Sequence, residues 1–197
     1  MSDDAPFEIV AIASSAGGMT ALRSVLSRLP AEFPASIVIV QHLDPRHRSL
    51  MAHILGRDTK LPVKEAQEGE RILPGSVYIG PPNRHFLVST DLRVMLVDSE
   101  LVHFVRPSAD LLFESVAASC KEHTIALVLT GTGSDASMGV TAVKKMGGTV
   151  IAQDEATSEF FGMPGAAIAT GNVDFVLSLA DIPGALTSLV WPEAPNG

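Results

Sequence analysis

The segment 9–18 reads Ile-Val-Ala-Ile-Ala-Ser-Ser-Ala-Gly-Gly, in which an apolar strand runs directly into a serine and glycine turn. A helical pattern follows from Met19 to Leu29 and ends before Pro30. Strand, tight turn and helix in this order are typical of the first unit of an open α/β fold. Such folds carry their chemistry at the carboxyl edge of the sheet, which is where this turn is expected to lie.

The turn itself is compatible with three interpretations. Gly17 and Gly18 could let a phosphate approach the backbone, as in a nucleotide-binding loop. Alternatively, Ala13 and Gly17 flank Ser15 at the spacing of a nucleophile elbow, which exposes a serine to a substrate carbonyl. The turn could also be only structural, and the segment alone leaves all three open.

Strand and helix signals alternate along the rest of the chain. Strands are expected at Glu8–Ala13, Ser36–Gln41, Leu61–Val63, Val77–Gly80, His85–Val88, Arg93–Val97, Thr124–Leu129, Thr149–Ala152 and Phe175–Leu177, and helices at Met19–Leu29, Ser49–Leu55, Ser108–Cys120, Ser137–Met146 and, more weakly, Pro183–Val190. Several strands are continuous apolar runs, as in sheets covered on both faces. The alternation predicts an α/β fold with a doubly wound, mostly parallel sheet, helices on both faces and an appended β-hairpin.

Length and composition indicate a single soluble domain. The chain has 197 residues, 46% of them hydrophobic, so we expect one domain over 1–197 with its core at about 8–186. A formal charge of −8 argues against a nucleic-acid partner, whose phosphates would be repelled. The polar start, Met1 to Pro6, and the lack of long apolar runs predict a cytoplasmic protein without membrane insertion. Cys120 is the only cysteine and is expected to be a packed thiol.

Three polar residues follow three of the expected strands. Ser15 follows the first, His42 follows the second, and Asp135 lies shortly after the strand that ends at Leu129. The carboxyl ends of parallel strands meet at one edge, so these side chains should approach one another. An alcohol, an imidazole and a carboxylate are the groups that serine hydrolysis requires.

Each of the three residues also has a purely structural interpretation. Ser15 could cap the following helix, and Ser14 could replace it as the nucleophile, although the spacing to the glycines favours Ser15. His42 could be a satisfied polar residue at a strand end. Asp135 could cap the helix that begins near Ser137. His85, close to another strand end, is not expected to be catalytic.

Five blocks together resemble the catalytic domain of the chemotaxis protein-glutamate methylesterases, the CheB family. They are Ala13-Ser14-Ser15-Ala16-Gly17-Gly18, Gln41-His42, Arg106-Pro107-Ser108, Leu129-Thr130-Gly131-Thr132-Gly133-Ser134-Asp135 and Phe161-Gly162-Met163-Pro164. The blocks occur in family order, and the resemblance extends from about Glu8 to Leu186.

The resemblance implies a specific activity and site. Similar enzymes hydrolyse glutamate γ-methyl esters on the cytoplasmic helices of chemoreceptors, and many also deamidate glutamines. By matched position, Ser15 is the nucleophile, His42 the base and then acid, and Asp135 the orienting carboxylate. The site residues implied beyond this triad are the backbone amides of Ala16 and Thr132 as oxyanion donors and Phe161 and Met163 as substrate-binding residues. The resemblance implies no cofactor and no metal.

The sequence departs from the family pattern in three places. Ala16 stands where well-known members have threonine, and Gly165 stands where a basic residue is often found. The first strand begins almost at once, so no N-terminal phosphoreceiver domain is expected in this chain. The chain would then be a stand-alone esterase, an excised domain or a member regulated by signalling partners.

Other classes of function have weaker support. A dinucleotide site would require Gly-x-Gly-x-x-Gly at the first turn, which is not present. A metal hydrolase could use His42, Asp44, His47 and His53, but no further ligand cluster accompanies them. A catalytically quiet signalling scaffold with the same fold remains an alternative, because the presence of triad residues does not establish a rate.

Overall fold

A seven-stranded sheet forms the centre of the protein, in the order β3-β4-β2-β1-β7-β8-β9. The structure is a computed structural model that describes residues 9–42, 50–102 and 104–191. The sheet strands are β1 (Ile9–Ser14), β2 (Ser36–Gln41), β3 (Val63–Glu65), β4 (Val77–Ile79), β7 (Thr124–Val128), β8 (Thr149–Gln153) and β9 (Phe175–Leu177). Every neighbouring pair in this sheet is parallel. The predicted α/β fold is therefore confirmed.

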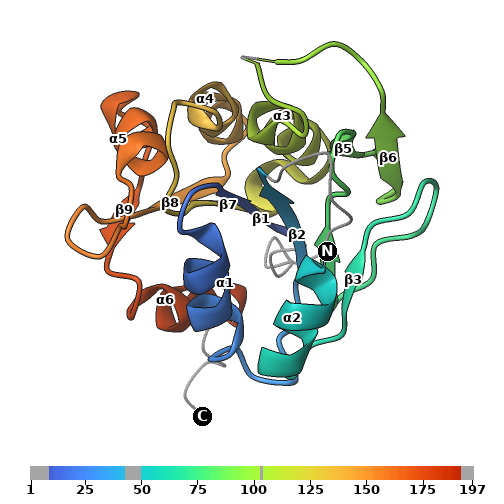
Figure 1. The fold of residues 1–197 in the computed structure, drawn as a ribbon, viewed down its shortest axis with the longest axis horizontal. Coiled ribbons are helices and arrows are strands. Elements are labelled where there is room, and N and C mark those ends of the chain that lie inside the picture. The colour runs from blue at the N-terminus through green and yellow to red at the C-terminus, as the bar shows by residue number, and fades with distance from the viewer. Residues whose placement is uncertain (1–8, 43–49, 103, 192–197) are drawn as a thin grey trace.

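Helices cover both faces of the sheet, as predicted (Figure 1). They are α1 (Gly18–Leu26), α2 (Met51–Asp58), α3 (Ala109–Cys120), α4 (Ser137–Lys145), α5 (Gly162–Ala169) and α6 (Ile182–Val190), with a 3₁₀ turn, η1 (Lys121–His123). Helices α1, α2 and α6 contribute to one buried cluster, and α3, α4 and α5 to the other. Side chains alternate along β1, so Val10 and Ile12 face the first cluster while Ala11 and Ala13 face the second.

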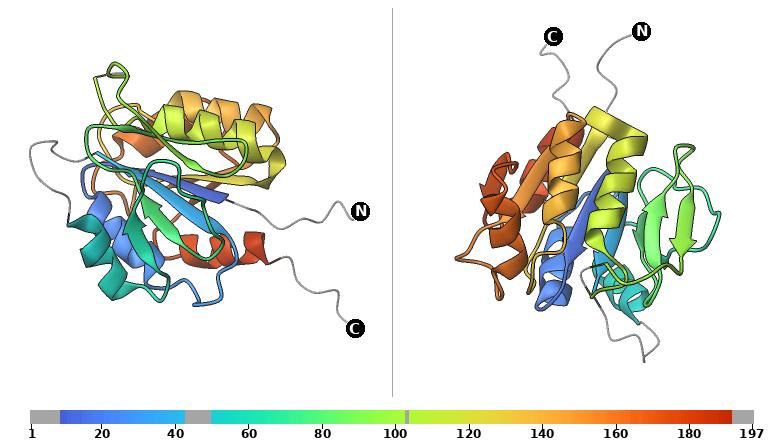
Figure 2. Two further views of the ribbon diagram at one scale, coloured as in Figure 1. Left: turned by 90° about the vertical axis from the view of Figure 1, so that its right-hand side faces the viewer. Right: turned by 90° about the horizontal axis from the view of Figure 1, so that it is seen from above.

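The appended hairpin consists of β5 (His85–Val88) and β6 (Val94–Val97). It lies against α3, outside the main sheet (Figure 2). Phe86 and Val88 of β5 and Val94 of β6 are buried in the same cluster as α3. The appended hairpin expected from the sequence is thus present, and it extends the core on the α3 side.

The chain reverses its direction of winding at β1. From this strand the sheet grows towards β2 on one side and towards β7 on the other. Loops after these strands diverge and leave a crevice, where ligands of doubly wound proteins bind. The segments that carry Ser15, His42 and Asp135 follow β1, β2 and β7, the three strands at this switch point.

Some boundaries differ from the sequence-based expectation. The first helix ends at Leu26 rather than Leu29, and the third strand is Val63–Glu65 rather than Leu61–Val63. Helix α5 was not among the expected helices, because glycines and a proline weaken its local pattern. Burial of Met163 and Ala167 against the rest of the core stabilises it. The expected starts at Glu8 and Ser49 lie outside the described residues.

Helices α3 and α4 pack at very close range. A Cβ atom at Gly139 would lie 2.6 Å from Cβ of Phe113 and 3.1 Å from the backbone oxygen of Asp110. Glycine is therefore required where these helices meet. Cys120, near the end of α3, is buried, as expected. Within the described residues, no helix combines the length and apolar character needed to cross a membrane.

We expect Gly139→Ala to lower the free energy of unfolding by about 1 to 3 kcal/mol, because the added methyl group forces α3 and α4 apart. Gly184→Ala in α6 is the matched control, since, apart from its own helix backbone and chain neighbours, no described atom lies within 4 Å of a Cβ at that position. The control should leave stability unchanged or raise it by up to about 1 kcal/mol. Urea unfolding of both variants measures this, and equal losses would contradict the packing account.

Candidate active site

A cleft of about 570 Å³ lies at the carboxyl edge of the sheet. It is lined by Ser15, His42, Phe104, Val105, Thr132, Gly133, Ser134 and Asp135. The structure therefore brings the three residues singled out from the sequence, Ser15, His42 and Asp135, to one surface depression. Their side chains approach from the loops after β1, β2 and β7.

The two adjacent serines occupy different environments. Ser14 is fully buried, and its hydroxyl donates a hydrogen bond of 2.6 Å to Oε1 of Gln41. Ser15 is partly exposed and lines the cleft. Of the two hydroxyls, only that of Ser15 is therefore available to a substrate in the cleft.

Gln41 connects the loops after β1 and β2. Its Nε2 donates to the backbone oxygens of Ser15, at 2.8 Å, and of His42, at 3.1 Å. The first turn of α1 packs directly on this contact, because a Cβ at Gly18 would lie 2.1 Å from Oε1 of Gln41. The glycine turn noted in the sequence thus lets α1 approach the buried Ser14–Gln41 pair.

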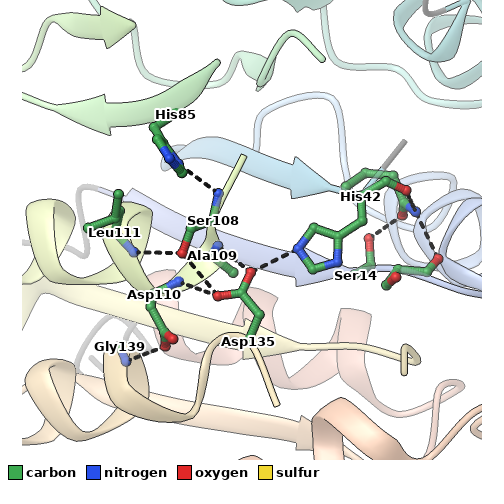
Figure 3. A network of polar contacts seen from close by, with 11 residues as sticks. Ser14, His42, His85, Ser108, Ala109, Asp110, Leu111, Asp135 and Gly139 are labelled. Carbon is green, nitrogen blue, oxygen red and sulfur yellow. Dashed lines mark hydrogen bonds and ion pairs between the residues drawn. The ribbon is translucent and has the colours of Figure 1, made fainter. Parts of the chain in front are cut away.

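His42 and Asp135 are joined by a hydrogen bond of 2.8 Å between Nε2 and Oδ2 (Figure 3). Asp135 accepts at this position, so Nε2 carries the proton and Nδ1 is left as an acceptor. No group among the described residues donates to Nδ1 of His42. This orientation is the reverse of that in chymotrypsin, where Nδ1 contacts the aspartate.

The carboxylate of Asp135 is buried at the N-terminus of α3. Oδ1 accepts from the hydroxyl of Ser108, at 3.0 Å, and from the amide of Asp110, at 3.1 Å, while Oδ2 accepts from the amide of Ala109, at 2.6 Å. Burial alone would raise the pKa of Asp135. The hydrogen bonds from His42, Ala109 and Asp110 outweigh that effect, so the pKa lies below its usual value.

Asp135 caps a different helix from the one considered in the sequence. It lies just before α4, but its side chain caps α3 (Figure 3). Asp110 of α3 in turn accepts a hydrogen bond of 2.8 Å from the amide of Gly139 in α4. The two helices thus cap each other reciprocally. Ala136, between Asp135 and α4, has a φ of 91°, a strained value for a residue with a side chain.

Two backbone amides next to the cleft have no partner within the described part of the chain. They belong to Ala16 and Thr132, the two oxyanion donors that the family resemblance implies. The loops that carry them lie close together, because a Cβ at Gly131 would be 2.8 Å from Cβ of Ser15. The hydroxyl of Thr130 donates to the oxygen of Ala16 at 3.0 Å and joins the two loops.

The Phe161–Pro164 block packs against Gly131, in the loop after β7. Met163 is fully buried, and its sulfur lies 2.4 Å from where a Cβ on Gly131 would be. The ring of Phe161, which is half-buried, packs near Gly165. Neither side chain is among the described residues that line the cleft, and burial leaves Met163 without a surface for direct substrate contact.

Ser108 is the functional contact that reasoning from the residues missed. The sequence showed it only as the first residue of a helical pattern and as part of the Arg106–Ser108 block. Its position as the N-cap of α3 was the available signal. Of the residues considered for a metal site, Asp44 and His47 lie outside the described residues, and the described part contains no group of three metal-binding side chains.

Comparisons with known proteins show which family the chain resembles. A family model described as CheB methylesterase matches residues 10–186. A protein-glutamate methylesterase/protein-glutamine glutaminase of Maricaulis maris is 42% identical over 181 residues, which cover 90% of this chain and 45% of that protein. A Leptospira interrogans relative named for the same two activities is 40% identical over 176 residues, which cover 89% of this chain and 91% of that protein.

A solved structure is also similar over nearly the whole chain. The crystal structure of the Thermotoga maritima CheB methylesterase catalytic domain matches with a TM-score of 0.91 and 40% identity, covering 94% of this chain and 100% of that one. A sequence identity of 40% over the aligned residues shows more than a shared fold. The chain belongs to the CheB methylesterase family.

Proposed function

We propose that this protein is a serine hydrolase that demethylates glutamate γ-methyl esters on the cytoplasmic helices of chemoreceptors. The observation that carries the proposal is the buried, helix-capped Asp135 bonded to His42 in the cleft that also holds Ser15. The names of the relatives supply protein-glutamate methyl esters as the substrate class, and the chemoreceptor helices come from the family resemblance. The chain spans about half the length of some of these relatives.

In the first half of the reaction, Oγ of Ser15 attacks the ester carbonyl carbon. Nδ1 of His42 accepts the serine proton, while Asp135 stabilises the resulting imidazolium through Nε2. The tetrahedral intermediate then collapses, and the bond between the carbonyl carbon and the methoxy oxygen breaks. The methoxy oxygen takes the proton from His42 and leaves as methanol, so an acyl-enzyme remains on Ser15.

In the second half, a water molecule replaces methanol. Nδ1 of His42 accepts a proton from the water as the water oxygen attacks the acyl carbon. The bond to Oγ of Ser15 then breaks, and Ser15 recovers its proton from His42. The product is a free glutamate carboxylate.

The amides of Ala16 and Thr132 are the proposed oxyanion donors. Negative charge develops on the former carbonyl oxygen in both halves of the reaction, and fixed N–H groups stabilise it without reorganisation. Loss of one such donor typically costs about 3 to 4 kcal/mol in the activation barrier. The close contact at Gly131, which positions the two loops, supports this role.

Deamidation of glutamine is a second proposed activity, because relatives carry protein-glutamine glutaminase in their names. The same acyl-enzyme would form, with ammonia as the leaving group in place of methanol. Ammonia release from receptors with glutamine at the methylation sites measures this activity separately from ester cleavage. A signalling scaffold without catalysis would release neither product.

We expect Ser15→Ala to lower kcat for methanol release from methylated receptor membranes by about 10⁴-fold or more, because the variant lacks the proposed nucleophile. Ser27→Ala, at the exposed end of α1, is the control and should retain full activity. Equal methanol release by the wild-type protein and Ser15→Ala would overturn the proposed function.

The rate of the chemical step should fall in acid as a single group takes up a proton. Activity falls as His42 becomes protonated, because Nδ1 can no longer accept the serine proton. The pKa of Asp135 is lowered, so its carboxylate stays charged through mild acid and adds no second step. The logarithm of the single-turnover rate constant should rise with pH with a slope of one on the acidic side, whereas a flat profile or a slope of two would contradict these assignments.

A further inference from the structure

We infer that His85 is a positioning residue for the catalytic carboxylate and acts through Ser108, an inference that rests on the proposed function. His85 is fully buried in the hairpin strand β5. Its Nδ1 accepts a hydrogen bond of 3.1 Å from the backbone amide of Ser108, and its Nε2 lies 2.9 Å from the backbone oxygen of Glu100. The ring is therefore fixed at both nitrogens, with the proton on Nε2.

Ser108 connects the fixed ring of His85 to the carboxylate of Asp135. It is the N-cap of α3, and its hydroxyl donates to Oδ1 of Asp135 at 3.0 Å. The amides that follow it, of Ala109 and Asp110, complete the set of donors to the same carboxylate. The position of Ser108 thus sets where the N-terminus of α3 meets Asp135, and its own amide is held by His85 (Figure 3).

The amide of Ser108 requires an acceptor from outside the helix. An N-cap residue precedes the helical hydrogen bonds, so its N–H group has no acceptor within the helix. A buried amide without an acceptor is costly, and the chain would shift to find one. Such a shift would move the hydroxyl and amides that hold Asp135, and through Asp135 it would reorient His42.

A second contact between the hairpin and α3 supplies a matched control. The amide of Val88, also in β5, donates to the hydroxyl of Ser115 in α3 at 3.0 Å. Ser115→Ala removes one acceptor for one hairpin amide at the same interface, but Ser115 makes no contact with Asp135. If His85 had only a structural role, Ser115→Ala and the variants of His85 should therefore change kcat to a similar extent.

Two amide substitutions separate the two contacts of His85. In His85→Asn the side-chain oxygen can occupy the position of Nδ1, which preserves the acceptor for Ser108 and loses the contact with Glu100. In His85→Gln the terminal amide reaches the position of Nε2, which preserves the Glu100 contact and loses the acceptor for Ser108. The inference predicts that these similar changes have different effects on kcat.

We expect His85→Gln to lower kcat for methanol release about 10-fold or more, by analogy with the cost of small displacements in other active sites. His85→Asn and Ser115→Ala should stay within about 3-fold of the wild-type kcat, the scatter expected of neighbouring contacts. KM should be unchanged in all three, because His85 does not line the cleft. Melting curves confirm that each variant is folded.

A double-mutant cycle tests the route through Ser108. If His85 acts through Ser108, the two changes are not independent, and Ser108→Ala combined with His85→Gln lowers kcat by less than the product of the two single losses. Equal kcat for His85→Gln and His85→Asn, or full additivity in the cycle, would overturn the inference. If Ser15→Ala is inactive while His85→Gln retains the wild-type kcat, only this inference fails. Full activity of Ser15→Ala would instead overturn the proposed function.

Discussion

The hydrogen bonds between the carboxylate of Asp135 and the N-terminus of α3 are the interaction on which the site depends. A buried carboxylate is costly unless donors satisfy it, and α3 supplies two backbone amides and the hydroxyl of Ser108. The positive end of the helix dipole adds to the same effect. The result is an anion held in a fixed place with one oxygen directed to His42.

The architecture explains why this anion can be buried. Asp135, in the loop just before α4, caps α3, and Asp110 of α3 caps α4, so the first turn of each helix finds an acceptor in the segment packed against it. The reciprocal arrangement requires the helices to be close, which Gly139 permits. Stability and positioning are therefore coupled here. The groups that hold the helices together are the groups that orient the proposed triad.

The sheet positions the other two residues of the proposed triad, Ser15 and His42. Ser14 pairs with Gln41 in the register of β1 and β2, and their side chains are joined by a buried hydrogen bond. This contact fixes the ends of both strands, so that the next residue in each chain segment, Ser15 or His42, emerges into the cleft. The catalytic roles proposed for these two residues thus depend on a buried pair that takes no part in the chemistry.

Much of the fold was predictable from local pattern. Continuous apolar runs identified β1, β2 and β7, and the rule that parallel strand ends converge placed Ser15, His42 and Asp135 near one another. Periodicity did not predict helix α5, because its glycines and proline give little local signal; only Pro164 hinted at a helix start, and burial of Met163 stabilises the helix.

The donors at the start of α3 that hold Asp135 were not predictable from the residues alone, although its approach to His42 was. The sequence shows the helix that follows Asp135, whereas the helix that it caps begins at Ala109, 26 residues before it. Likewise, the contact between His85 and Ser108 joins a hairpin to a helix through the packing of distant segments. Periodicity describes one element at a time, so contacts of this kind require the tertiary structure.

Labelling with a serine-directed phosphonate, followed by mass mapping of the digested protein, tests the central claim most directly. A serine activated by His42 and Asp135 should react, and the label should be found on Ser15. The buried hydroxyl of Ser14 should carry none. A label on Ser14 or on another residue, or no label on protein that releases methanol, would contradict the account.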